Sequence, residues 1–202
     1  MTRPAAVVDK EMDAIWAEIR AAQARIATLR KEREPEPVQD YELTAMDGEK
    51  VRLSALFGGR RDLVLIHNMG RQCPMCTTWA DGFNGVRRHL EDRAAFVVSS
   101  PDEPHVQREF AASRGWGFRM VSTKDTTLAA DLGFRDEKGR HWPGVSVLWK
   151  TDDGKVVRVG LSGFGPGDEF SPVFNLLPMM KDGQGEWWPK ISYGEASQAR
   201  SS

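Results

Sequence analysis

The stretch LVLIHNMGRQCPMCTTWADGFNG, from Leu63 to Gly85, contains both cysteines of the chain. Leu63–Ile66 is a continuous apolar run, which is typical of a strand buried on both faces of a sheet. Residues 77–92 can form a helix. Cys73 and Cys76 therefore lie in the loop between a buried strand and a helix, where α/β proteins place their functional sites.

The chain on both sides of this loop alternates between strand and helix patterns. The expected elements are a hairpin over 41–44 and 50–53, the strand 63–66, a helix over 77–92, a strand over 94–98, a helix over 105–114, an extended piece over 120–122, a helix over 126–132, a hairpin over 145–149 and 156–159, and a helix opened by Ser171 and Pro172. Two parallel strands joined by a helix, then another helix and an antiparallel hairpin, predict an α/β, thioredoxin-like three-layer fold with a central mixed sheet.

Residues 8–33 predict a long helical arm before this domain. Apolar side chains recur at alternating steps of four and three, as in the a/d positions of a coiled coil. We call them the apolar seam: Val8, Met12, Ile15, Ile19, Ala22, Ile26 and Leu29. Pro35 and Pro37 end the helix, because proline disfavours helix at the residue before it. The arm either packs on its own domain or forms a homodimer, and the sequence leaves both open.

The expected organisation is an N-terminal amphipathic helix over 1–34, a thioredoxin-like domain over 35–185 and a C-terminal extension over 186–202. The residues after Tyr193 are small and polar, so we expect part of the extension to be disordered.

Composition narrows the class of protein. The formal net charge is −1 with acids and bases interspersed, which gives no electrostatic case for nucleic acid or an anionic membrane as partner. No apolar run approaches the roughly 18 to 20 residues that span a bilayer, and the N-terminus meets charge too early for a secretory signal. We expect a cytoplasmic protein, in which a close cysteine pair is more often catalytic or metal-binding than a structural disulfide.

The spacing Cys73-Pro74-Met75-Cys76 at a helix start predicts a redox pair. Unpaired backbone N–H groups and the helix dipole favour a thiolate there, and Pro74 suits the first helical turn. Arg71 adds positive charge two residues upstream. We expect Cys73 to be the exposed, attacking thiolate and Cys76 to be the buried, resolving thiol.

Two other interpretations of the pair stay open. A zinc site is one, since His89 follows Cys76 at the spacing of a zinc finger, but the next histidine, His105, is too distant for the fourth ligand. Two inert, buried cysteines are the other.

The pair leads into Trp79-Ala80-Asp81-Gly82-Phe83, and this combination is more specific than the cysteine spacing alone. Further residues of the same pattern are Leu53 to Arg60 (LSALFGGR), His67, Met69, His89, Leu90, Gly115, Trp116, Val121 and Ser122. On these residues, over roughly 41–134, the chain resembles a bacterial thioredoxin-like family known as domain of unknown function 899 (DUF899), which is related to peroxiredoxins of the AhpC/TSA type.

The resemblance implies a thioredoxin fold with a redox role, and three departures limit it. Thioredoxins have a proline immediately before the strand that faces their cysteines. Here Pro143 precedes Gly144 and Val145 and lies one or two residues early, so that Val145 takes that position. They also have a buried carboxylate where this chain has Val64, so His67 is the nearest titratable group for a proton shuttle, although a hydrogen-bonded structural histidine is the more frequent case.

The third departure concerns peroxide. Peroxiredoxins have a proline and a threonine or serine upstream of the attacking cysteine. Those positions are Ile66 and Gly70 relative to Cys73, and Met69 and Cys73 relative to Cys76. Fast peroxidase activity is therefore not expected.

These observations predict a thiol–disulfide oxidoreductase, of thioredoxin-like or peroxiredoxin-like type, with no cofactor and no metal. Its substrate would be a protein or small-molecule disulfide or thiol, and Trp79 and Asp81 would shape a binding surface beside the thiols. The alternatives are a thioredoxin-fold binding or assembly module without catalysis, and a slow thiol peroxidase.

Overall fold

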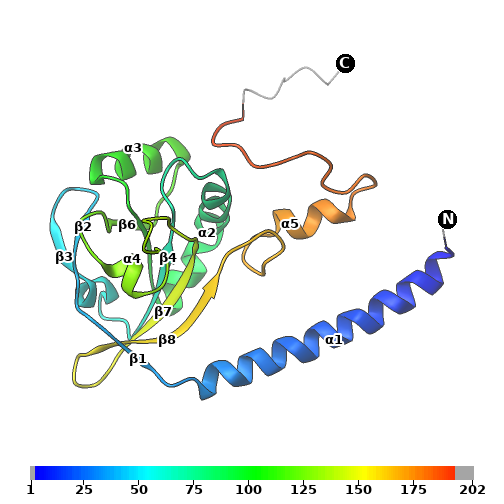
Figure 1. The fold of residues 1–202 in the computed structure, drawn as a ribbon, viewed down its shortest axis with the longest axis horizontal. Coiled ribbons are helices and arrows are strands. Elements are labelled where there is room, and N and C mark those ends of the chain that lie inside the picture. The colour runs from blue at the N-terminus through cyan, green and yellow to red at the C-terminus, as the bar shows by residue number, and fades with distance from the viewer. Residues whose placement is uncertain (1–2, 194–202) are drawn as a thin grey trace. The chain divides into compact units, whose positions relative to one another are not determined.

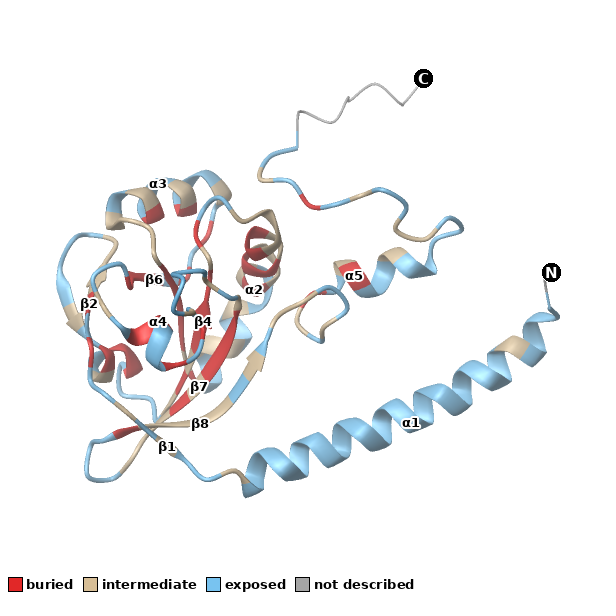
Figure 2. Cartoon of the chain, in the orientation of Figure 1, coloured by how far each residue is buried: buried red, intermediate tan, exposed pale blue. Residues whose placement is uncertain are grey.

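The computed structural model describes residues 3–193. The chain divides between Pro35 and Glu36 into two units. The first unit is the helix α1 (Ala5–Glu32), which ends where Arg33 turns to an extended conformation two residues before Pro35 (Figure 1). Within Ala5–Glu32, all of which the structure describes, no residue is buried (Figure 2). None of the helices within residues 3–193 has the length and apolar character needed to cross a membrane.

The second unit contains one sheet of eight strands in the order β1-β8-β7-β4-β5-β6-β2-β3. The strands are β1 (Glu36–Val38), β2 (Glu42–Ala45), β3 (Lys50–Arg52), β4 (Asp62–His67), β5 (Ala95–Ser100), β6 (Arg119–Ser122), β7 (Gly144–Lys150) and β8 (Val156–Gly163). β4, β5 and β6 run parallel, and the other pairs are antiparallel. The mixed sheet is confirmed, with β4 in its interior between β7 and β5.

Helices cover both faces of this sheet. α2 (Pro74–Arg93) and α3 (Pro104–Arg114) pack on one face, in a cluster that includes Ile66 and Val98. The opposite face carries Leu65 and Val97, covered by the 3-10 helix η1 (Leu53–Phe57) and the one-turn helix α4 (Leu128–Asp131). Successive residues of β4 and β5 face opposite sides of the sheet because side chains in a strand alternate with a period of two. Buried residues of the strands and helices are red in Figure 2. The predicted three-layer arrangement is confirmed.

The structure differs from the sequence-based expectations at three places. The sequence predicted no strand over Glu36–Val38, yet these residues form the edge strand β1, paired with β8, where proline is tolerated because an edge strand needs only half of its hydrogen bonds. The helix expected over 126–132 is present but shorter, as the single turn of α4. Ser171 does not cap the following helix α5 (Val173–Leu176), because its Oγ is buried without a hydrogen-bond partner and Pro172 is the N-cap residue.

The C-terminal segment continues from α5 through the 3-10 helix η2 (Leu177–Met179). The disorder expected after Tyr193 falls on residues 194–202, which lie outside the described residues.

Candidate functional site

The loop from β4 to α2 is held in a tight turn by hydrogen bonds between its own residues. The Asn68 side-chain oxygen accepts a hydrogen bond from the Gly70 N–H at 2.8 Å, and the Gly70 carbonyl accepts one from the Cys73 N–H at 3.1 Å. Gly70 has a φ of +105°, which residues with a Cβ atom rarely adopt. The turn brings the chain from the end of β4 to Cys73 in six residues.

A carboxylate from the neighbouring strand fixes this turn. Asp102 follows β5, and its Oδ2 accepts hydrogen bonds from the Arg71 N–H at 2.8 Å and from the Ser100 hydroxyl at 3.0 Å. A Cβ atom on Gly70 would lie 3.0 Å from Asp102 Oδ1, so the carboxylate fills the space beside the glycine. Because β4 and β5 are parallel, their carboxyl ends meet at the same edge of the sheet, and this brings Asp102 to the loop.

Cys73 is the N-cap residue of α2. Its Sγ accepts a hydrogen bond from the Cys76 N–H at 3.1 Å, in the role that a serine or aspartate oxygen usually has at this position. Its carbonyl accepts the first helical hydrogen bond, from the Thr77 N–H at 3.0 Å. Pro74 occupies the first turn, where its missing N–H leaves no bond unmade.

The two thiols are close but differ in surroundings. Both are free, their side chains come within 2.7 Å of each other, Cys73 is half-buried and Cys76 is 3% exposed. A hydrogen bond from the Cys76 thiol lowers the pKa of Cys73 to about 7, with smaller help from the N–H groups of Cys76 and Met75 and against the effect of burial. The same hydrogen bond, together with burial and the charge of Cys73, raises the pKa of Cys76. At pH 7 about half of Cys73 is therefore a thiolate, whereas Cys76 stays a thiol.

His67 lies on the other face of the sheet. It follows Ile66, which faces α2, so strand alternation turns the imidazole away from the cysteines. Its ring stacks on Phe134 with centroids 3.9 Å apart, and its Nε2 lies 2.9 Å from the Ser146 hydroxyl. Burial lowers the pKa of His67 to about 3, with smaller contributions from the charges of Arg158 and His141.

The other predicted supporting residues have structural contacts. Arg71 is exposed, and its contact with Asp102 is made by its backbone N–H. Trp79 is 2% exposed, and its indole N–H donates to Asp168 Oδ1 at 3.3 Å. Val145 is buried in the same cluster as Trp79, and it lies opposite Ile66 in the register of β7 and β4.

Asp81 joins α2 to the end of α3. Its carboxylate pairs with the Arg114 guanidinium, and its Oδ1 accepts a hydrogen bond from the Trp116 indole N–H at 2.8 Å. Arg114 also donates to the Ile191 carbonyl at 3.1 Å, which fastens the C-terminal segment to the domain.

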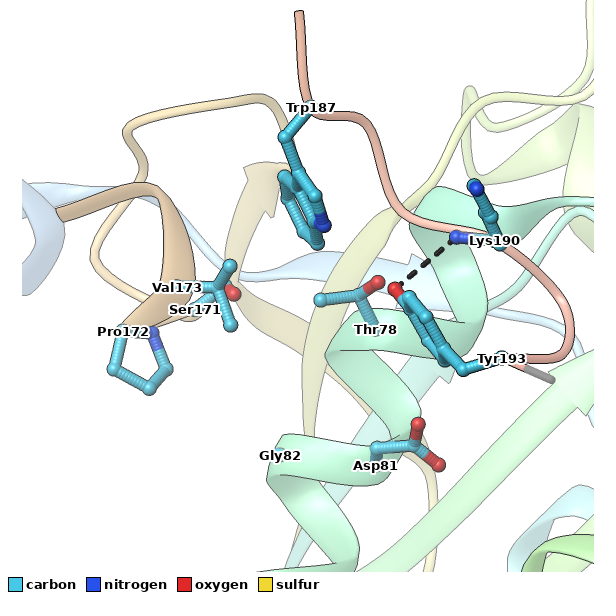
Figure 3. A pocket seen from close by; sticks show the side chains of 9 residues that line it. All are labelled: Thr78, Asp81, Gly82, Ser171, Pro172, Val173, Trp187, Lys190 and Tyr193. Carbon is cyan, nitrogen blue, oxygen red and sulfur yellow. Dashed lines mark hydrogen bonds between the residues drawn. The ribbon is translucent and has the colours of Figure 1, made fainter. Parts of the chain in front are cut away.

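A hollow of about 360 Å³ lies between α2, the start of α5 and the C-terminal segment (Figure 3). Its α2 wall is Thr78, Asp81 and Gly82, so it begins one turn beyond Cys73 and Pro74. Its other lining residues are Ser171, Pro172, Val173, Trp187, Lys190 and Tyr193. Aromatic rings and hydroxyl groups thus flank the outer face of the helix that carries the cysteines.

The zinc-finger spacing does not correspond to a shared site. Cys76 is in the first turn of α2 and His89 lies 13 residues further along the same helix, roughly 20 Å away at about 1.5 Å per residue. Among residues 3–193 there is no group of three or more His, Cys, Asp or Glu side chains that could hold a metal ion.

Three residues that support the site were not singled out from the sequence: Asn68, Asp102 and Asp168. Asp102 had a signal, since it follows the second parallel strand and so belongs at the same sheet edge as the cysteine loop. The sequence around Asp168 did not indicate its role. Its carboxylate accepts hydrogen bonds from the loop Gly165–Ser171 and from Trp79, which is far away in the sequence.

Comparisons with known proteins agree with this architecture. The family described as bacterial protein of unknown function (DUF899) matches residues 9–198, which confirms the resemblance. No curated protein matches the chain significantly. The crystal structure of peroxidoxin BcpB from Mycobacterium tuberculosis is 28% identical, with a TM-score of 0.53 over 68% of this chain and 86% of that one.

Two more distant structures share the fold. A cysteine-to-serine mutant of PrxQ from Xylella fastidiosa is 18% identical, with a TM-score of 0.57 over 73% of this chain and 96% of that one. Reduced Prx3 from Vibrio vulnificus, in complex with hydrogen peroxide, is 15% identical, with a TM-score of 0.55 over 67% and 90%. These similarities confirm the predicted thioredoxin-like fold.

Proposed function

We propose that this chain, which belongs to the bacterial protein family of unknown function DUF899, is a thiol–disulfide oxidoreductase in which Cys73 attacks and Cys76 resolves. The observation that carries the proposal is the N-cap geometry. The Cys73 sulfur accepts the Cys76 N–H at the start of α2 and has a pKa of about 7, while Cys76 is buried one turn further on. An accessible thiolate beside a neutral, buried thiol is the division of labour that disulfide exchange requires.

The reaction is a pair of exchanges. The Cys73 thiolate attacks one sulfur of a substrate disulfide, forms a mixed disulfide and releases the other substrate sulfur as a thiolate, which takes up a proton. Cys76 then loses its proton and attacks the Cys73 sulfur, so that a Cys73–Cys76 disulfide forms and the second substrate thiolate leaves and is protonated. The substrate gains two electrons and two protons; the protein supplies both electrons and the proton of Cys76, and the second proton comes from solvent because Cys73 starts as a thiolate. An external dithiol returns the pair to its starting state.

A second candidate, slow thiol peroxidase activity, is favoured by the similarity to the mycobacterial peroxidoxin. In this route the Cys73 sulfur attacks one oxygen of a hydroperoxide, the other oxygen leaves as water or alcohol, and Cys76 displaces hydroxide from the resulting sulfenic acid. The positions where peroxiredoxins have threonine or serine and proline hold Gly70 and Ile66 here, so little orients the peroxide. We therefore expect peroxide consumption to be much slower than disulfide reduction.

The test compares two serine variants under identical conditions. Cys73→Ser should abolish reduction of insulin or of a low-molecular-weight disulfide, because the attacking sulfur is gone. Cys76→Ser should lose turnover but accumulate one substrate equivalent as a mixed disulfide on Cys73, detectable by mass spectrometry. Met75→Leu, between the two cysteines, is the matched control and should keep its activity. Full activity in Cys73→Ser, or no reversible loss of two thiols on oxidation of the parent protein, would reject the proposal.

A further inference from the structure

α1 carries an apolar face that the other described residues of its own unit, 3–35, do not cover. Five residues of the apolar seam are 37–55% exposed: Met12, Ile15, Ile19, Ile26 and Leu29. A single helix gains most of its stability in proteins by packing such a face, and this one has 28 residues, or four heptads.

Charge is distributed unevenly along the same helix. Residues 3–18 carry two basic and four acidic side chains, whereas residues 19–33 carry five basic and one acidic side chain. An antiparallel partner with the same sequence would place the acidic half of each helix beside the basic half of the other. A parallel partner would place like halves together.

We propose that α1 pairs with α1 of a second copy of this chain as an antiparallel two-helix coiled coil. The seam packs in layers when Ile19 of one helix meets Ala22 of the second, Ile15 meets Ile26, and Met12 meets Leu29. In each helix these layers bury the seam from Met12 to Leu29.

The residues that flank the seam favour this orientation. In the antiparallel register Asp9 lies opposite Arg30 of the second helix, and Glu18 lies opposite Arg25. Each contact occurs twice because of the two-fold symmetry. In a parallel pair no flanking contact joins opposite charges, and Arg25 of each helix faces Arg30 of the other.

One flanking contact opposes the antiparallel pair. Glu11 lies near Glu32 of the second helix, but Glu11 already forms an ion pair with Arg3 of its own chain, which offsets the repulsion. The antiparallel pair therefore has four attractive contacts and two repulsive contacts that are partly neutralised. The charges favour the antiparallel over the parallel arrangement.

Sedimentation of the full-length chain tests the pairing. The expected mass is twice 22.6 kDa, and Ile19→Asp, in the seam, should reduce it to that of the single chain. Ala17→Asp, on the outer face of the same helix, introduces the same charge and should leave the dimer intact. A single-chain mass for the parent protein, which is also what packing of α1 on its own second unit gives, would overturn the proposal.

Orientation is tested by charge reversal. Arg25→Glu faces Glu18 in the antiparallel pair and should weaken dimerisation by about tenfold, since two attractive contacts become repulsive. Adding Glu18→Arg should restore the affinity. In a parallel pair Arg25→Glu instead relieves the contact with Arg30, so tighter dimerisation of that variant would overturn the antiparallel arrangement.

Discussion

His67 at the end of β4 and Cys73 at the start of α2 both have a lowered pKa, and the shift favours the neutral form of His67 but the charged form of Cys73. His67 is buried against Phe134, and the loss of solvent lowers its pKa to about 3, so that it stays neutral. Cys73 is half-buried, and hydrogen bonds donated at the start of α2 lower its pKa to about 7, so that its charged form is favoured. Burial alone suppresses charge, whereas partial burial with aligned donors creates it. Proximity to the cysteines in sequence therefore does not make His67 part of their chemistry.

The largest expected effect comes from breaking the packing on the His67 side. Gly144 lies opposite His67 in the β4–β7 register, and a Cβ there would lie 2.3 Å from the Phe134 ring and 2.5 Å from the Ser162 carbonyl oxygen. Gly144→Ala should lower the free energy of unfolding by about 3 kcal/mol, because a backbone oxygen cannot move aside.

Gly160→Ala, in the adjacent strand, is the control for this substitution. Its Cβ would have its nearest contact at 3.5 Å, with Val147, which is ordinary packing distance. We expect its stability to stay within about 0.5 kcal/mol of the parent in urea unfolding. Equal stability of the two alanine variants would show that the ring and the Ser162 carbonyl do not confine this position.

The next effect is the dependence of the free energy of unfolding on pH that results from the lowered pKa of His67. Its folded pKa, about 3, lies below its ordinary value of 6.5, so protonation favours the unfolded chain. Its contribution to the free energy of unfolding is complete above pH 6.5 and declines as the pH falls from 6.5 toward 3.

Comparison with His67→Gln isolates this contribution. The variant should be less stable at pH 7, because it loses the stacking on Phe134, yet its stability should fall less steeply between pH 6 and 4. Parallel stability curves for the two proteins over that range would mean that His67 titrates normally in the folded state.

The smallest expected effect is that of Arg71→Ala on the pKa of Cys73. The Arg71 side chain is exposed, and its backbone N–H makes the contact with Asp102. Arg71→Ala keeps that N–H, so the pKa of Cys73 should move by less than about 0.3, within the effect of one screened surface charge. A rise of a full pH unit in the titration of the Cys73 thiol would assign the activation to the guanidinium instead of the helix start.

The local parts of this site were predictable, whereas its long-range parts were not. The apolar run Leu63–Ile66 and the Cys73–Pro74 start of α2 follow from short sequence patterns, and the structure has them. Which face of β4 is covered by α2 depends on packing from the whole chain, so the orientation of His67 had no local signal.

Strand β1 shows the same limit. Its three residues surround a proline and have no strand pattern of their own, and they are extended because β8 offers a free edge. The apolar seam of α1 could also be predicted from the sequence. A repeat of apolar residues in one chain does not, however, identify the surface that covers the seam.

The most direct test of the account is the pH dependence of iodoacetamide alkylation of the reduced, full-length protein, with mass spectrometry to locate the adduct. The account predicts that Cys73 is alkylated first and that its rate reaches half of its plateau near pH 7, since the helix start and the Cys76 thiol stabilise the thiolate. A midpoint at about 8.5, the value of an unperturbed cysteine, or first alkylation at Cys76, would contradict it.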